Sequence, residues 1–152
     1  MGTIVCLLII ILALPVQAFD IIKPSENGRL YGGAITKLTG GTTVYMPIGG
    51  EDVNDTAIKA GTPFSSNYNF TKLTCTVDNA PLSTEVVTMT LQTGTCGGVL
   101  SDTTLSCAIV GSAVKATDND VVAVSSSQCG VIKTTYSSSA VTSTPRYSLE
   151  IN

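Results

Sequence analysis

The second half of the chain repeats short segments in which apolar and polar residues alternate. Leu73, Cys75 and Val77, for example, are separated by threonines. Because successive side chains of a β-strand point to opposite faces, each segment would place apolar residues in a core and hydroxyl-bearing residues in water. The alternation predicts strands over residues 70–78, 85–92, 103–110, 120–126, 130–137 and 146–151, with turns between them, including 111–120.

Two further strands are expected before these segments. Residues 42–48 alternate in the same way, and residues 19–41 combine short apolar stretches with glycines that are typical of strands or of an extended arm. The longest predicted loop covers residues 49–64, with a single helical turn expected at 57–59. No later segment sustains a helical period, so the sequence predicts an all-β protein, a β-sandwich or jelly roll of about eight antiparallel strands preceded by a hydrophobic segment.

That hydrophobic segment lies at the N-terminus. Residues 4–16 form an almost unbroken apolar run, and Val16-Gln17-Ala18 has side chains that a signal peptidase accepts. The run is shorter than the roughly 20 residues that a membrane-spanning helix needs. Residues 1–18 are therefore expected to be a signal peptide, with a retained hydrophobic anchor as the alternative and as the expected route to a membrane. Residues 19–41 would then form the arm or first strands, and 42–152 the sandwich.

The composition narrows the class of protein. A chain of 152 residues has room for one domain with one core. Only 12% of the residues are charged, against about 25% in an average globular protein, so hydroxyl groups must supply much of the polar surface. The net charge is −3 and the 8 basic residues are scattered along the chain. This pattern lacks the clustered basic residues typical of nucleic-acid binding, and no nucleic-acid partner is expected.

The sequence contains little that indicates an enzyme. It contains no His and no Gly-x-Ser-x-Gly motif, so a nucleophilic Ser would lack its usual base and its usual turn. The candidate carboxylates Glu51, Asp52, Asp55, Asp118 and Asp120 fall in segments predicted to be turns, where Asp and Glu are common without any catalytic role. We therefore expect neither catalysis nor a cofactor.

Two acidic segments are weak candidates for a calcium site. They contain Asp52 and Asp55 in the long loop, and Asp118 and Asp120 in a later turn. Ca²⁺ takes six to eight oxygen ligands at about 2.3–2.6 Å, and neither segment has the spacing of an EF-hand loop. Turn formation explains these residues without a metal, so no metal site is expected.

Four other residues are weaker candidates for modification or ligand binding. Asn54 and Asn69 each begin an Asn-x-Thr triplet, the acceptor pattern for N-glycosylation. Tyr45 and Tyr68 flank the long loop and could stack on a sugar, although packing in a core or an interface is the more common use of Tyr.

The order of the strand and turn motifs resembles a known family. The motifs are Asn69-Phe70-Thr71-Lys72-Leu73, Thr76-Val77-Asp78-Asn79-Ala80-Pro81, Val87-Thr88-Met89-Thr90-Leu91, Leu105-Ser106-Cys107-Ala108-Ile109, Asp120-Val121-Val122-Ala123-Val124 and Gly130-Val131-Ile132-Lys133. Over roughly residues 42–151 they resemble a small jelly-roll module that recurs in bacteriophage structural proteins and exported bacterial proteins. The module is similar in outline to tumour-necrosis-factor-like trimers.

Beyond the leader the chain has four cysteines, and an even number in an exported β-domain predicts two disulfides with three possible connectivities. The resemblance implies antiparallel pairing of strand 85–92 with strand 130–137. It thereby favours the disulfides Cys96–Cys129 and Cys75–Cys107, with a local Cys96–Cys107 loop as the rival.

The expected function is non-enzymatic. We expect a jelly-roll subunit that self-associates into a trimer or polymer, with other virion or surface proteins as further partners. Its place would be a virion, as a spike, capsid decoration or fibre, or an extracellular surface filament. The alternative is a secreted module that binds a glycan or another ligand. The expected location is the extracellular space or the surface of a virion, and the arm is expected to add as a strand to a neighbouring subunit.

Overall fold

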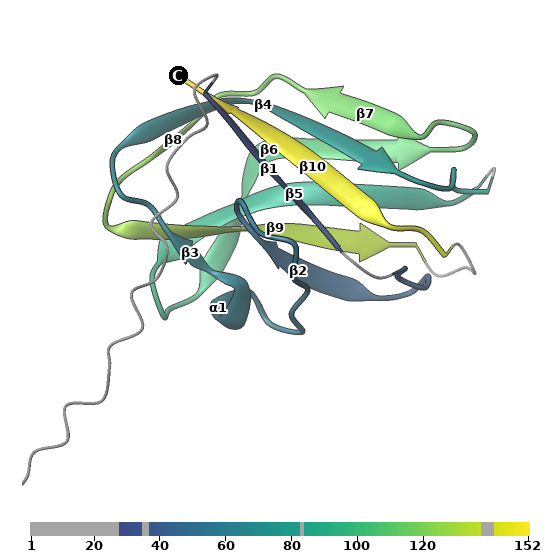
Figure 1. Cartoon of the computed structure of the whole chain (residues 1–152), viewed down its shortest axis with the longest axis horizontal. Helices are drawn as coiled ribbons and strands as arrows, with labels where there is room; N and C mark the ends of the chain where they lie inside the picture. Colours follow the sequence, from purple (N-terminus) through teal and green to yellow (C-terminus); the bar gives the residue numbers. More distant parts are fainter. Residues whose placement is uncertain (1–27, 35–36, 83, 138–141) are drawn as a thin grey trace, which may run out of the picture.

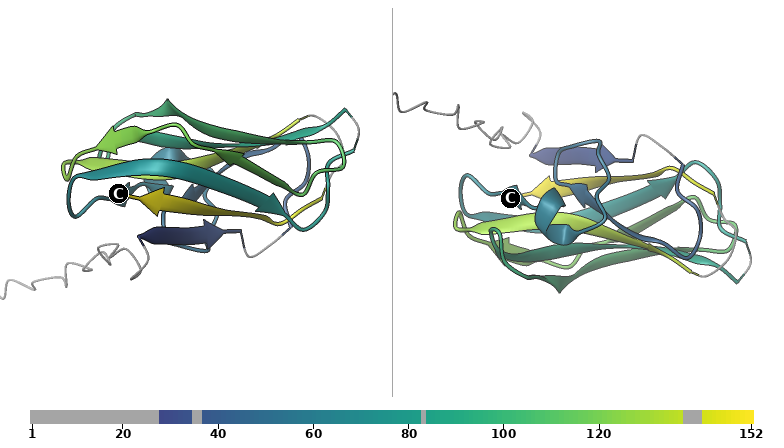
Figure 2. Two further views of the ribbon diagram at one scale, coloured as in Figure 1. Left: turned by 90° about the horizontal axis from the view of Figure 1, so that it is seen from above. Right: turned by 90° about the horizontal axis from the view of Figure 1, so that it is seen from below.

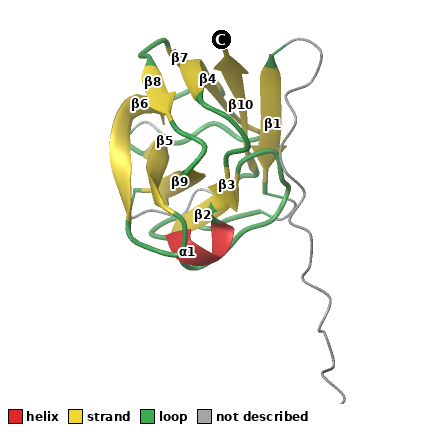
Figure 3. Cartoon of the chain, turned by 90° about the vertical axis from the view of Figure 1, so that its left-hand side faces the viewer, coloured by secondary structure: helices red, strands yellow, loops and turns green. Residues whose placement is uncertain are grey.

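The protein is a sandwich of two antiparallel sheets (Figure 1). The computed structural model describes residues 28–34, 37–82, 84–137 and 142–152. The first sheet contains β1 (Arg29–Gly33), β10 (Pro145–Ile151), β4 (Tyr68–Val77) and β7 (Lys115–Asp118) in that order, with β8 (Val122–Val124) also paired to β4. The second contains β2 (Thr43–Pro47), β9 (Gln128–Tyr136), β5 (Val86–Thr95) and β6 (Leu100–Val110), with β3 (Thr62–Pro63) also paired to β9. Figure 3 looks along the strands and shows the two layers.

The strand order confirms the jelly roll. β7 and β8 pair with different parts of β4, and β2 and β3 with different parts of β9, so each pair fills one strand position. In each sheet the first strand then lies beside a strand from near the C-terminus, β1 beside β10 and β2 beside β9, which is the long return connection of a Greek key. The expected pairing of residues 85–92 with 130–137 is present as β5 with β9, where Met89 lies opposite Thr134.

The predicted strands match the observed ones except at β3, which lies inside the predicted loop 49–64, and in the region of β7 and β8. The expected strand at 120–126 is confined to β8, and the expected turn at 111–120 contains β7. Residues 115–118 lack large apolar side chains, and their inward positions are held by Ala116 and Asp118, opposite Cys75 and Leu73 of β4. This edge strand exists because β4 offers free backbone groups to pair with, a tertiary effect that local alternation does not report.

One core fills the space between the sheets. It is built from the alternating positions that the sequence pattern singled out, and Phe70, Leu73, Met89 and Leu105 are completely buried. Thr134 is buried with them, and among the described residues its hydroxyl has no hydrogen-bond partner. The alternation therefore identified the core correctly, including one position where a polar residue fills an apolar site.

A second, smaller cluster lies on the outer side of the second sheet. The expected helical turn is confirmed as α1 (Ala57–Ala60). Its Ala60 is buried with Leu100, Cys129 and Val131, whose side chains point away from the main core. α1 and its loop thus cover the half of this face around Cys129 and Val131, whereas the half around Ala108 and Val110 is exposed.

Side chains close both long edges of the sandwich. On the edge formed by β1 and β2, the Tyr147 hydroxyl accepts a hydrogen bond from the backbone N–H of Gly49 and donates one to the carbonyl of Pro47. On the edge formed by β6 and β7, the carboxylate of Asp118 accepts the backbone N–H of Ser106 at 2.7 Å. Each link joins the two sheets where their unpaired strand edges would otherwise meet water.

Both favoured disulfides are confirmed. Cys75–Cys107 connects β4 to β6 through the core, with a Cα–Cα distance of 6.4 Å. Cys96–Cys129 joins the β5–β6 turn to the start of β9, at 4.9 Å. The rival Cys96–Cys107 loop is therefore wrong, because Cys107 faces inward and Cys96 lies beyond the end of β5.

The arm residues that the structure describes pair within their own chain. β1 lies antiparallel to β10 from Arg29 opposite Glu150 to Gly33 opposite Arg146 (Figure 2). For residues 29–33 the expected addition to a neighbouring subunit is thus not observed, because their own sheet supplies the partner strand. The leader, residues 1–18, and the first part of the arm lie outside the described residues.

Candidate functional site

The open half of the second sheet's outer face is rich in threonine. We call it the threonine face, and it consists of Thr43, Tyr45, Val86, Thr88, Thr90, Ser106, Ala108, Val110, Lys133 and Thr135. These residues lie in register across four strands, so that Thr88 has Thr135 on one side and Ala108 on the other. Val86 and Val110 form the pair at its end, and Val110 is 54% exposed.

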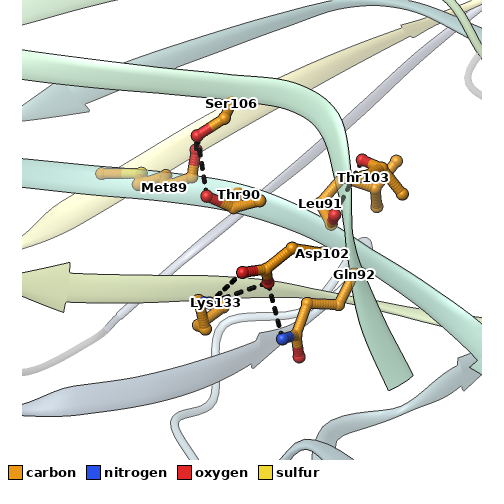
Figure 4. Close-up of polar contacts among 8 residues, drawn as sticks. All are labelled: Met89, Thr90, Leu91, Gln92, Asp102, Thr103, Ser106 and Lys133. Carbon is orange, nitrogen blue, oxygen red and sulfur yellow. Dashed lines mark hydrogen bonds and ion pairs between the residues drawn. The ribbon is translucent and has the colours of Figure 1, made fainter.

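A polar network neutralises the single cation of the threonine face (Figure 4). Lys133 Nζ donates to Asp102 Oδ1 at 2.7 Å, and Gln92 Nε2 donates to the same oxygen at 2.7 Å. Partial burial raises the pKa of Asp102, but the hydrogen bonds from Lys133 and Gln92 outweigh it and hold that pKa below its usual value. The carboxylate therefore stays charged and paired with Lys133 at neutral pH.

Hydroxyl groups on the same face are also paired. The hydroxyls of Thr90 and Ser106 lie 2.7 Å apart, and Thr103 donates to the carbonyl of Leu91 at 2.8 Å (Figure 4). Thr90 is only 7% exposed because these neighbours cover it. The face is therefore smooth, polar and close to neutral.

The outer face of the first sheet has the opposite character. We call it the basic face, and its residues are Arg29, Tyr31, Lys72, Thr74, Thr76, Lys115, Thr117, Arg146, Ser148 and Glu150. It holds four of the chain's eight basic residues. Of the residues described on this face Glu150 alone is acidic, so four cations less one carboxylate leave three positive charges on a chain whose net charge is −3.

Glu150 lies between two of these cations. Arg29 and Lys72 are its neighbours on β1 and β4, at 2.6 and 3.4 Å from its Oε1. A hydrogen bond with Tyr31 and then the charge of Glu150 raise the pKa of Arg29. Among the salt bridges of the described residues none involves Arg146 or Lys115, at the other end of the face.

A hollow of about 560 Å³ opens beside Arg146 at the edge of the basic face. Tyr31, Gly33, Glu51 and Tyr147 also line it. Tyr31 is 59% exposed, and the stem of Arg146 lies close to Gly33, where an added Cβ would come within 2.9 Å of Arg146 Cγ. The hollow thus combines an aromatic ring, a guanidinium group and a carboxylate, and the sequence analysis missed it because Tyr31 and Arg146 are far apart in the chain.

The calcium candidates are dispersed. The carboxylate of Asp118 accepts the backbone N–H groups of Ser106 and Asp120. Asp55 forms a salt bridge with Lys59 at 2.9 Å, and the carboxylate of Asp52 accepts the backbone N–H of Val53. No group of three or more potential metal ligands lies together in the part of the chain that the structure describes. Asp118 thus ends a strand and links the two sheets, whereas Asp52 and Asp55 make contacts within their own loop.

The structure does not bring Tyr45 and Tyr68 together. Tyr45 lies on β2 of the second sheet and packs against the cluster under α1, whereas Tyr68 lies on β4 of the first sheet and packs edge-on against Phe64 at 6.3 Å. Of the glycosylation candidates, Asn69 is exposed on β4, while Asn54 is half-buried and its backbone pairs with Tyr45.

One Ser-x-x-Lys spacing does occur in the sequence, from Ser112 to Lys115. This spacing brings two side chains together only on a helix. Here Ser112 lies in the exposed turn after β6, and Lys115 begins β7. The spacing therefore does not form a nucleophile and base pair.

The fold and its links define a disulfide-stabilised jelly-roll domain. Comparison with protein-family models, curated proteins and solved structures gave no match. Two disulfides indicate that the domain folds in an oxidising environment, as extracellular proteins do. None of the helices in the described ranges is long and apolar enough to cross a membrane.

Proposed function

We propose that the protein is an exported structural subunit of a virion or an extracellular filament, and that copies associate through the threonine face. The observation that carries this proposal is the low charge of that face. Cores of protein interfaces are depleted of charged residues. On the threonine face the only cation, Lys133, is already neutralised by Asp102 within its own chain.

A second copy fits this face because its ion pair and its least exposed hydroxyls are already paired within the chain. The hydroxyls of Thr90 and Ser106 are bonded to one another, so covering them leaves no new unpaired group. Val86, Ala108 and Val110 supply apolar area at one end. Burial of apolar area stabilises an association by about 25 cal/mol per Å².

Sedimentation of the mature protein tests the proposal. Ala108 is exposed on β6 within the threonine face, and Ala123 is exposed on β8 of the first sheet. We expect the wild type to sediment as an oligomer, the Ala108→Glu variant as a monomer, and the matched Ala123→Glu control as the wild type does. A monomeric wild type, or an oligomer that Ala108→Glu leaves intact, would contradict the proposal.

A second candidate function, a ligand-binding module, is favoured by the hollow beside Arg146. Exposed aromatic rings next to charged groups are typical of sites that bind polar ligands such as sugars. Tyr31 supplies the ring, and Arg146 and Glu51 the charged groups. Screening the protein on a glycan array would test this candidate, and the absence of any bound glycan would count against it.

A further inference from the structure

We propose that the basic face binds an acidic polysaccharide, with one sugar of the chain held in the hollow beside Tyr31 and Arg146. This inference rests on the second candidate function and names its class of ligand. It is independent of self-association, which we place on the opposite sheet.

The charge distribution argues for an anionic ligand. Three net positive charges gather on one face of a chain whose net charge is −3, so the acidic residues lie elsewhere. The cause is the strand register, which places basic residues of β1, β4, β7 and β10 on the same side of the sheet. A local concentration of one sign attracts ligands of the other sign and raises their rate of association.

The cations are spread out and do not converge. Arg146 and Lys115 lie on either side of Thr76 in one row, so two inter-strand spacings separate their Cα atoms by about 10 Å. Arg29 and Lys72 belong to a second row, four residues farther along the strands. This second row lies about 13 Å from the row of Arg146 and Lys115. A small anion would contact only one row, whereas an extended polyanion can contact both.

Hydroxyl groups occupy the space between the two rows. Ser148, Thr74 and Thr117 lie side by side there, and Tyr31 continues their row on β1. Thr74 and Thr117 hydroxyls are 3.4 Å apart, which is a weak contact that leaves them able to bond a ligand. Sugar hydroxyls are both donors and acceptors, as these groups are, so the row suits a polysaccharide better than an apolar or a protein ligand.

The hollow supplies a position for one sugar. The exposed ring of Tyr31 can cover the apolar face of a pyranose, and the guanidinium of Arg146 can form two parallel hydrogen bonds to a carboxylate or sulfate. Glu51, on the other side, can accept hydrogen bonds from sugar hydroxyls. This combination distinguishes an acidic sugar from other anions.

Titration calorimetry with four defined probes tests the proposal. The probes are polygalacturonate, heparin, neutral dextran and double-stranded DNA. We expect the first two to bind, dextran not to bind, and DNA to bind more weakly than the acidic polysaccharides. Raising the salt concentration from about 0.05 to 0.5 M should weaken binding, because salt screens contacts between exposed charges.

Matched variants locate the site. The double variant Arg146→Gln with Lys115→Gln should bind polygalacturonate roughly 2- to 30-fold more weakly, given about 0.2–1 kcal/mol for each exposed ion pair. The control, Lys37→Gln with Lys59→Gln, removes the same charge from exposed positions outside the basic face and should bind as the wild type does. Tyr31→Ala should weaken polygalacturonate binding more than DNA binding.

The possible outcomes separate the proposals. Equal affinity for DNA and polysaccharide, or an equal loss in the control variant, would overturn the inference in favour of general attraction of polyanions. Binding of neutral glycans alone would overturn it but retain the second candidate function, and no binding of any glycan would overturn both. Sedimentation of the same samples reports self-association separately.

Discussion

The hydroxyl of Tyr147 lies 3.1 Å from the backbone nitrogen of Gly49, 98 residues earlier in the chain. Burial raises the pKa of Tyr147, so its hydroxyl stays protonated and donates to the carbonyl of Pro47. Gly32 makes this approach possible, because a Cβ there would collide with the hydroxyl and with the carbonyl of Gly50. One side chain thus fastens β10 to the end of β2 across the open edge of the sandwich.

Removing that hydroxyl should destabilise the domain. We expect Tyr147→Phe to lower the free energy of unfolding by about 1–3 kcal/mol, because it leaves a backbone donor and acceptor unpaired. Urea denaturation measures the change. Tyr45→Phe is the control, since no hydrogen bond of the Tyr45 hydroxyl is found among the described residues, and a loss as large as that of Tyr147→Phe would contradict the prediction.

The buried hydroxyl of Thr134 should lower the free energy of unfolding of the wild-type domain. It is completely buried without a partner among the described residues. Thr134→Val keeps the shape and removes the unpaired group, so we expect a gain of about 1 kcal/mol in the free energy of unfolding. Thr90→Val, which breaks the 2.7 Å contact with Ser106, should lose about 1 kcal/mol. If both variants shift stability in the same direction, our account of Thr134 is wrong.

The two disulfides should differ in their access to reductant. Cys96 is exposed, whereas Cys75 and Cys107 are 0% and 3% exposed. Under native conditions a mild reductant followed by alkylation should therefore label Cys96 and Cys129 first, as mass spectrometry of peptides would show. Earlier labelling of Cys75 would contradict this order.

Removing either disulfide should also be costly. The two disulfides close loops with sequence separations of 32 and 33 residues. Each restricts the unfolded chain and thereby adds about 3–4 kcal/mol to the free energy of unfolding. The double change Cys75→Ala with Cys107→Ala should cost more than Cys96→Ala with Cys129→Ala, because it also leaves a cavity in the core. Thermal unfolding compares the two variants directly.

Acid should weaken the link between Asp78 and Thr144. The carboxylate accepts the Thr144 backbone N–H at 2.6 Å and its hydroxyl at 3.1 Å, and chiefly the former lowers the pKa of Asp78. A carboxylate with a lowered pKa in the folded state stabilises the fold above its unfolded pKa, and this contribution is lost as the pH falls through the folded pKa. We expect the Tm to fall between about pH 5 and pH 2.

The variant Asp78→Asn isolates that contribution. It should show a smaller fall in Tm over the same pH range, because its side chain does not titrate. Scanning calorimetry at several pH values makes the comparison. An equal fall in both proteins would show that other carboxylates account for the acid sensitivity.

The alternation of Leu73, Cys75 and Val77 predicted their burial, because a period of two directly encodes which side faces the core. It did not predict β7, whose small and polar residues are held only by pairing with β4. The strand pairing implied by the family resemblance was enough to predict both disulfides. The hollow and the two outer faces could not be predicted, since they depend on register between strands that are distant in the chain, as Tyr31 and Arg146 are.

The ends of β1 and β10 are tied together, with Ile151 donating its backbone N–H to the carbonyl of Gly28 at 2.7 Å. A tether or fusion partner joined to either strand at this point would emerge from the same pole of the domain (Figure 2). Val110 and Pro145 lie at the opposite pole, where Pro145 pairs with Val77. A domain held at the Gly28–Ile151 pole would therefore present the ends of β4 and β6 outward and both sheet faces sideways, so that lateral neighbours and ligands in the medium could reach different faces at once.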